Sequence, residues 1–192
     1  MDIKAFYRKY CGVGDEALLS DLVKFTRIRA VEAGSTILEP GTQLNQMLLL
    51  GSGVVRSYFW GGNERIYTDG FYSAPGTLLS ICRCMPEPEC GIEALSACEI
   101  LDISAGDVAE LMSRSLPFVQ MYARLLERMA LFQWQEKTAC FQYSHQERYI
   151  RFLRQYPNWK GLISSKYIAD YVGVAPASLS RLRRRLKSGN KG

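Results

Sequence analysis

Four arginines lie close together near the end of the chain, at Arg181, Arg183, Arg184 and Arg185. They close the segment YIADYVGVAPASLSRLRRRL, which occupies residues 167–186. A guanidinium group can donate two parallel hydrogen bonds to O6 and N7 of guanine, and it can also bind a phosphate. The same residues could equally form a solvated basic surface, so their chemistry depends on the helix that carries them.

Positive charge is concentrated at this end of the chain. The whole sequence has 192 residues and a net charge of +5. Residues 160–192 contain eight lysines and arginines and one acid, Asp170, for a local net charge of +7, whereas residues 1–159 carry −2. Such a distribution is typical of a segment that meets a polyanion.

The basic segment has the signals of two helices joined by a sharp turn. Ser164, or its neighbour Ser165, can cap a short first helix. Gly173 then supplies the backbone freedom for a turn. Pro176 suits the first turn of the second helix, where its missing N–H costs nothing. The sequence therefore predicts a helix-turn-helix rather than a basic tail.

The second predicted helix has its leucines and its arginines on different faces. Leu179, Leu182 and Leu186 form a stripe that we expect to be buried. The outward face has small residues, Ala177 and Ser180, near its start, as suits the end of a recognition helix that enters the major groove deepest. We expect DNA contacts from Ser164, Lys166, Ala177, Ser178, Ser180, Arg181, Arg184, Arg185 and Lys187.

The expected roles within this set differ. Arg181 can pair with guanine, Ser180 can bond to several bases, and Ala177 can touch a thymine methyl group. Phosphate contacts, which supply affinity without sequence information, are expected from Lys166, Arg184, Arg185 and Lys187. Arg183 lies toward a flank of the helix, and the sequence assigns it no role.

A long helical pattern precedes this unit, from about Leu116 to Tyr143. Apolar residues along it follow the 4-3-4-3 spacing of a helix that pairs with another helix: Phe118, Tyr122, Leu125, Met129 and Phe132. We expect this stripe to form the dimerisation surface of a homodimer. The alternative is that it packs on the β-rich part of its own chain.

The first half of the chain has other patterns. Residues 1–24 have helical spacing, and residues 25–104 contain short apolar or alternating runs, such as QMLLLGSGVVRSYFW, separated by turn segments such as GGNE. Many short strands at this spacing indicate an antiparallel jelly roll or barrel.

Composition indicates a globular protein. The sequence is 47% hydrophobic, has no run of 18 apolar residues, and begins with charged residues where a signal peptide would be apolar. We therefore expect a cytoplasmic protein with no membrane partner, whose six cysteines are reduced thiols.

On these residues the chain resembles the Crp/Fnr transcriptional regulators, and more narrowly their short, Bacteroidetes-type branch. The resemblance is strongest in ERYIRFL and KYIADYVGVAPASLSRLRRRL, and SACEILDIS is similar to the last strand of the family's effector domain. It implies an α+β fold with a cyclic-nucleotide-binding-like β-roll (jelly roll) in residues 1–115, a dimerisation helix in 116–144 and a helix-turn-helix DNA-binding domain in 145–192. It further implies a homodimer that binds double-stranded DNA, with RNA polymerase as a candidate partner.

The effector pocket departs from the family pattern. Relatives that bind cyclic nucleotides carry a Gly-Glu segment and then an Arg-Ser or Arg-Thr pair. Here Gly76-Thr77 or Thr77-Leu78 stands at the first position, and Pro88 and Glu89 stand at the second. Because a glutamate would repel the cyclic phosphate, cyclic AMP is not the expected ligand, and the effector is unknown.

The recognition helix departs as well. Pro176 and Ala177 replace the family's Arg-Glu pair, and Arg181 alone matches, so we expect a different operator sequence. The chain ends at Gly192, which leaves a winged-helix type domain with its wing truncated.

Three cysteines, Cys82, Cys84 and Cys90, lie in the stretch expected to line the effector pocket. Thiolates there could hold a metal or act as a thiol switch. The alternative, which we favour, is that they are small buried hydrophobes, as Cys98 in its apolar strand would also be. We assign no metal and no cofactor.

Two other function classes compete with a DNA-binding regulator. A cupin-type enzyme holds its metal with several histidines, but His145 is the sole histidine and lies outside the β-rich part, so we expect no enzyme. A metabolite-binding module without DNA contact does not explain why the positive charge gathers on the helix-turn-helix.

Overall fold

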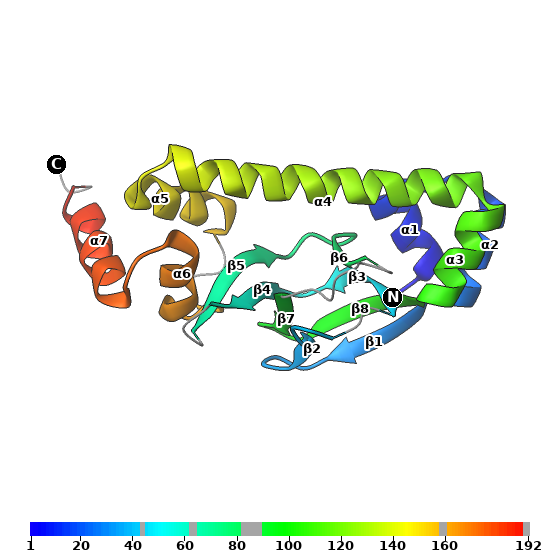
Figure 1. Cartoon of the computed structure of the whole chain (residues 1–192), viewed down its shortest axis with the longest axis horizontal. Helices are drawn as coiled ribbons and strands as arrows, with labels where there is room; N and C mark the ends of the chain where they lie inside the picture. Colours follow the sequence, from blue (N-terminus) through cyan, green and yellow to red (C-terminus); the bar gives the residue numbers. More distant parts are fainter. Residues whose placement is uncertain (43–44, 62–64, 82–89, 158–160, 190–192) are drawn as a thin grey trace.

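The structure of the protein is a computed structural model that describes residues 1–42, 45–61, 65–81, 90–157 and 161–189. A β-sandwich lies beside one long helix, with small helices at both ends of the molecule (Figure 1). The α+β class predicted from the sequence is confirmed.

The N-terminal helices are α1 (Ile3–Cys11) and α2 (Glu16–Phe25). The helical character expected over residues 1–24 is confirmed and is divided between these two helices. Gly12 adopts a left-handed conformation with φ of 67° and ends α1, and the Asp15 side chain then accepts a hydrogen bond of 2.7 Å from the Leu18 amide to start α2.

The described strands form two antiparallel sheets of four. The first has the order β1-β8-β3-β6, from β1 (Arg27–Val31), β8 (Cys98–Ser104), β3 (Gln46–Ser52) and β6 (Leu78–Ser80). The second has the order β2-β7-β4-β5, from β2 (Thr36–Leu38), β7 (Cys90–Ala94), β4 (Val55–Trp60) and β5 (Ile66–Tyr72). Apolar residues from both sheets share one core, among them Leu50, Val55, Ile92 and Ile100. The sandwich confirms the antiparallel β architecture expected from the short runs and turns.

Two helices follow the sandwich: α3 (Ala105–Arg114) and the long α4 (Leu116–Gln142). Ser115 caps α4 by accepting a hydrogen bond from the Phe118 amide, and proline stands in its first turn. Among the described residues, no helix has the length and apolar character required to cross a bilayer.

The five α4 residues assigned to dimerisation from their spacing face the body of their own chain. Phe118, Tyr122 and Leu125 are buried in a core with α1, α2, α3 and the first sheet, and Met129 packs against it. The centre of the Phe132 ring lies 5.2 Å from the centre of the Tyr72 ring on β5. The assignment is corrected on this point, and the alternative of packing within the chain holds for this stripe. The spacing of apolar residues indicates that this face of the helix is buried, but it does not indicate whether the same chain or a second copy buries it.

The C-terminal helices are α5 (His145–Gln155), α6 (Ser165–Val172) and α7 (Pro176–Gly189). They gather at the end of α4 that lies farthest from α1 and α2, with α7 outermost (Figure 1). Their own core includes Phe152, Ile168, Val172 and Leu179, and it takes in Phe71 from β5. This helix-turn-helix unit is therefore joined to the sandwich by packing as well as by the chain.

Candidate nucleic-acid interface

The turn between α6 and α7 is built as the sequence predicts. Ser164 is the N-cap of α6 and accepts a hydrogen bond of 3.3 Å from the Tyr167 amide. Gly173 ends the helix with φ of 82°, a conformation that other residues rarely adopt. These two residues set where α6 starts and stops, and so where α7 begins.

The end of α6 is also held by α5, in contacts that sequence reasoning missed. Arg148 donates a hydrogen bond of 2.6 Å to the Tyr171 carbonyl, and His145 Nδ1 lies 3.1 Å from the Val172 carbonyl. Because the last carbonyls of a helix lack partners within it, a cation from another helix stabilises this end. The position of the turn is thus fixed by contacts between α5 and α6.

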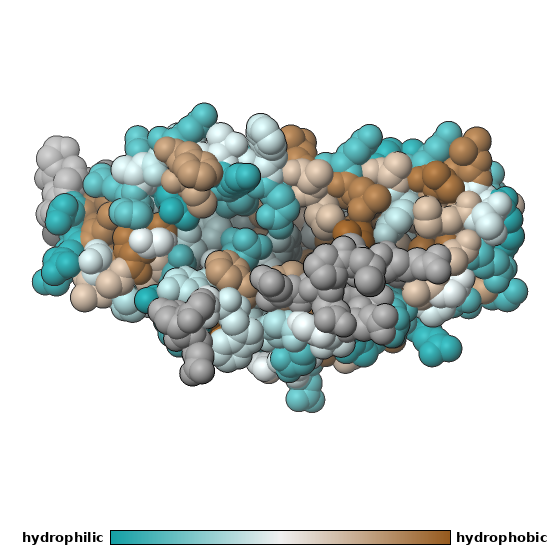
Figure 2. All heavy atoms as spheres, in the orientation of Figure 1, coloured by the Kyte–Doolittle hydropathy of each residue, from teal (hydrophilic) through white to brown (hydrophobic). Residues whose placement is uncertain are grey.

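The predicted division of α7 into a buried and an exposed face is confirmed. Leu179 is buried against α5 and α6, and Leu182 and Leu186 pack partly against the same core. The outer edge of α7 is hydrophilic, and apolar residues show between α7 and α6 (Figure 2). The leucines therefore hold the helix in place while its opposite face stays available.

The residues expected to contact DNA lie mostly on the outside of this unit. The described ones that are exposed are Ser164, Lys166, Ala177, Ser180, Arg181, Arg184 and Arg185. Ser178 is half-buried, and its hydroxyl accepts a hydrogen bond of 3.0 Å from the Arg181 guanidinium. The side chain of Lys187 lies outside the described part of the structure. One solvent-facing surface thus carries small residues at the start of α7 and arginines beyond them.

Arg183, to which the sequence gave no role, holds the three helices together. Its Nε donates a hydrogen bond of 3.0 Å to the Tyr149 hydroxyl on α5, and its Nη1 donates one of 2.7 Å to the Ser165 hydroxyl on α6. Its guanidinium also lies 5.6 Å from the centre of the Tyr149 ring. The four arginines therefore divide into one that positions the helix and three that face outward.

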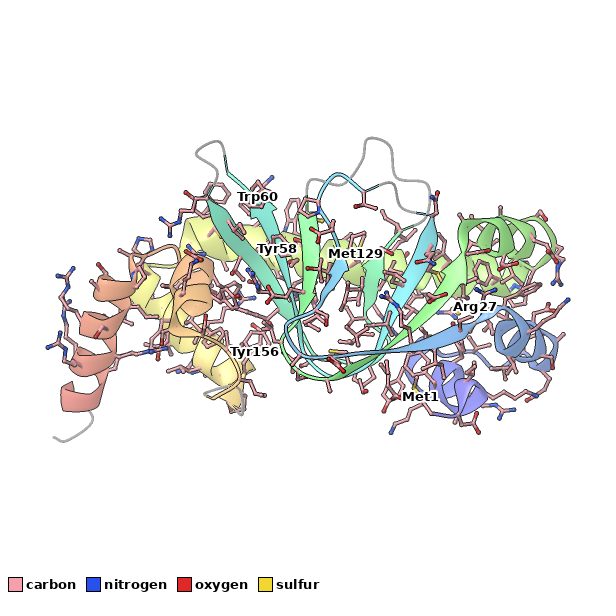
Figure 3. The ribbon with its side chains drawn as sticks, turned by 90° about the horizontal axis from the view of Figure 1, so that it is seen from below. Met1, Arg27, Tyr58, Trp60, Met129 and Tyr156 are labelled. Atoms are coloured by element: carbon pink, nitrogen blue, oxygen red, sulfur yellow. The ribbon has the colours of Figure 1, made fainter. Side chains whose placement is uncertain are left out.

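A cavity of about 440 Å³ lies between α4, the segment after β5 and the end of α5. Aromatic and aliphatic residues form most of its lining, including Phe71, Tyr72, Met129, Phe132 and Tyr156 (Met129 and Tyr156 are labelled in Figure 3). Burial raises the pKa of Tyr72 to about 12, so its hydroxyl stays protonated. The described lining is thus mainly apolar.

This cavity includes Gly76, Thr77 and Leu78, and the resemblance aligns either Gly76-Thr77 or Thr77-Leu78 with the family's Gly-Glu segment. The Thr77 hydroxyl donates a hydrogen bond of 2.7 Å to the Ala74 carbonyl, and Arg128 donates one of 2.9 Å to the Tyr10 carbonyl. No carboxylate is among the residues described for the lining. Pro88 and Glu89, expected at the phosphate-binding pair, lie outside the described residues.

The cysteines that the structure describes do not form a metal site. Cys98 is buried, as predicted, and its thiol donates to the Ser96 carbonyl at 3.1 Å. Burial raises the pKa of the Cys11 thiol to about 12, which keeps it protonated. Cys90 is half-buried on β7, whereas Cys82 and Cys84 lie outside the described residues. Within the described ranges, no group of three or more histidine, cysteine, aspartate or glutamate side chains could hold an ion.

Solved structures of Crp/Fnr regulators have the same fold over about nine-tenths of the chain. The c-di-GMP-responsive global regulator CLP of Xanthomonas campestris is 15% identical, with a TM-score of 0.75 over 92% of this chain and 93% of that one. FixK2 from Bradyrhizobium japonicum is 18% identical, with a TM-score of 0.71 over 86% of each chain. A protein of Eubacterium rectale, described as a candidate regulator of the Crp/Fnr family, is 18% identical, with a TM-score of 0.73 over 95% and 88%.

At these identities the likeness shows the fold. It comprises an N-terminal sandwich of the cyclic-nucleotide-binding type, a long helix and C-terminal helices, as the resemblance implied. No family model matches the sequence, and no curated protein does.

Proposed function

We propose that this chain, which has the fold of the Crp/Fnr transcription regulators, binds specific sequences of double-stranded DNA as a homodimer and regulates transcription. The observation that carries the proposal is the build of α7. It starts at a proline directly after a glycine turn, buries Leu179, and turns small residues and arginines to solvent. A helix positioned in this way can enter the major groove with its N-terminal end.

Electrostatics support the same function. Residues 160–192, the range that includes the helix-turn-helix, carry a net charge of +7, and their one acid, Asp170, forms an ion pair with Arg65 at 2.7 Å. Lysines and arginines that contact phosphates release bound counterions, so affinity for DNA should fall steeply as salt rises. RNA polymerase is a candidate partner of the bound dimer.

The surface for a second copy lies on the part of α4 that faces away from the sandwich. Trp134 and Phe141 are 71% and 83% exposed there, and Leu131 is 58% exposed. With Thr138, these residues repeat at intervals of three and four, which places them along one face of the helix. Two such faces can pair in parallel about a two-fold axis, and this arrangement brings both helix-turn-helix units to the same end.

Gel shifts on genomic fragments over a series of salt concentrations test the proposal. We expect discrete complexes on a few fragments, with affinity that decreases as salt increases. A metabolite-binding module without DNA contact, the competing function, would shift no fragment at any salt.

The Arg181→Ala variant is expected to lose about 1–3 kcal/mol of binding free energy for the operator and to relax the base preference at one position of each half-site. The reason is that Arg181 is exposed at the first turns of α7, where a guanidinium can reach guanine O6 and N7. A binding array over all single-base operator changes measures it. Lys187→Ala is the comparison, since loss of a phosphate contact should weaken all sequences alike. An unchanged base preference for Arg181→Ala would remove this assignment.

Cyclic AMP is expected to leave operator affinity and the unfolding temperature unchanged. Thr77 or Leu78 stands at the place of the family's glutamate, and the described lining of the cavity holds no carboxylate for a ribose. The volume and the mainly apolar lining of the cavity instead suit a compact, largely apolar effector. Titration with cyclic AMP during gel shifts and thermal unfolding checks this, and a saturable shift in either would contradict it.

A thiol- or metal-responsive regulator using Cys82, Cys84 and Cys90 is the remaining alternative, and it predicts operator affinity that changes with peroxide.

A further inference from the structure

We propose that the contacts between α6 and the sandwich fix the separation of the two recognition helices, and so select the distance between DNA half-sites. This inference rests on the proposed function. The docking contact consists of Arg56 and Arg65 on the sandwich and Tyr167 and Asp170 on α6, with Glu136 of α4 as a second support. No residue in it belongs to the set expected to touch DNA.

The first part of the docking contact is a buried arginine that faces an aromatic ring. Arg56 on β4 is 5% exposed, and its Nε donates a hydrogen bond of 2.7 Å to the Glu93 carboxylate on β7. The guanidinium carbon lies 3.7 Å from the centre of the Tyr167 ring on α6 and 4.9 Å from that of Tyr58 on β4. The sheet thus holds the cation in place, and the Tyr167 ring lies against it from the helix-turn-helix side. Cation–π contacts are strongest where water is excluded, as here.

The second part is an ion pair across the same junction. Arg65, just before β5, donates a hydrogen bond of 2.7 Å to the Asp170 carboxylate on α6. The Asp170 side chain is 2% exposed, whereas that of Arg65 is 47% exposed. Because a buried carboxylate is costly without a partner, α6 is favoured in the position where Asp170 meets this arginine.

The third part ties the unit to the end of α4. Tyr171 donates a hydrogen bond to the Glu136 carboxylate, and Arg151 of α5 donates another of 2.8 Å to the same carboxylate. Burial and the charge of Glu136 raise the pKa of Tyr171, so the hydroxyl stays a donor. The Tyr156 hydroxyl donates at 3.1 Å to the carbonyl of Phe71 on β5, and Tyr156 lies between the sheets and the C-terminal helices (Figure 3).

These contacts surround the unit on two sides, so they restrain how it can turn about the link at residues 143–144, between α4 and α5. In a homodimer paired along α4, a restrained unit presents each recognition helix at one distance and one angle. The second half-site is then bound at high effective concentration when the half-site spacing matches, and at low concentration otherwise. A helix-turn-helix unit joined to the chain by the link alone would bind half-sites at many spacings. The effective concentration of the second half-site would then be lower at each of them.

The full chain with Tyr167→Leu and Arg65→Ala together, called the undocked variant, tests this. Its affinity is measured for a single half-site and for two half-sites whose separation is varied up to half a helical turn, about five base pairs. We expect affinity for the single half-site to stay within about twofold of the parent, because α7 is untouched. For two half-sites we expect a loss of about tenfold or more at the preferred spacing and a flat dependence on spacing.

Three further variants complete the design. Arg29→Ala removes an exposed positive charge from β1, away from α6, and should keep the parent's spacing preference. Tyr167→Phe keeps the aromatic ring and should also keep the parent's spacing preference. Arg65→Glu, a change at a half-exposed position, places a carboxylate beside Asp170 and should flatten the preference even if the undocked variant does not fold.

The possible outcomes separate this inference from the proposed function. A folded undocked variant that keeps the parent's spacing preference would overturn the inference. So would a loss of single half-site affinity equal to the loss for two half-sites, because the contacts would then support the folding of the unit and not its placement. A parent chain that binds neither probe would instead contradict the proposed function.

Discussion

Replacing Trp134 with aspartate is expected to convert the proposed homodimer to a monomer and to lower affinity for a two-half-site operator by about 100-fold or more. Trp134 is 71% exposed at the centre of the proposed pairing face, between Leu131 and Phe141. In the dimer an aspartate there would bury a charge against an apolar partner surface, which is strongly unfavourable. Operator affinity falls because each monomer then binds one half-site alone.

Sedimentation or light scattering measures the oligomeric state, and gel shifts measure the operator affinity. Met112→Asp is the matched control, since Met112 is also an exposed apolar residue but lies on α3, outside the pairing face. It should stay dimeric with unchanged affinity. A Trp134→Asp chain that remains dimeric would show that another surface joins the two copies.

The Leu179→Ala variant is expected to destabilise the helix-turn-helix unit by about 2–5 kcal/mol. Leu179 is 1% exposed and packs among Ile168, Val172 and Tyr149, so its loss leaves a cavity where α7 meets α5 and α6. The helix that carries the residues proposed to contact DNA would then lose its fixed position. We expect operator binding to be lost at temperatures where the sandwich remains folded.

Urea unfolding followed by circular dichroism gives the change in stability. Leu162→Ala, in the same unit but 51% exposed, is the control and should alter stability by a few tenths of a kcal/mol at most. Equal effects of the two changes would mean that α7 is not held by its leucine stripe.

The helix-turn-helix could be predicted from the sequence because its signals are local. A cap at Ser164, a glycine at the turn and a proline at the start of α7 each act within a few residues, and each stands where expected. The stripe on α4 was misassigned, although its spacing was read correctly. Phe118 and Leu125 are covered by α1, α2, α3 and the first sheet, and only the tertiary structure distinguishes that partner from a second copy of α4.

The residues that position the unit could not be found from local patterns at all. Arg65 and Asp170 are 105 residues apart in the chain, and Tyr171 and Glu136 are 35 apart. In the sequence Arg183 is one of several basic residues of a basic helix, and its hydrogen bonds to Tyr149 and Ser165 are seen only in the structure. Such contacts depend on how the elements pack, which no spacing within one helix encodes.

Selection of bound sequences from random double-stranded DNA tests the central claim most directly, since it reports base readout and dimerisation together. We expect an enriched motif of two inverted half-sites whose centres lie about one helical turn apart, each with a guanine that depends on Arg181. Recovery of DNA without any enriched sequence, or of a single half-site with no partner, would contradict a dimeric regulator that reads DNA through α7.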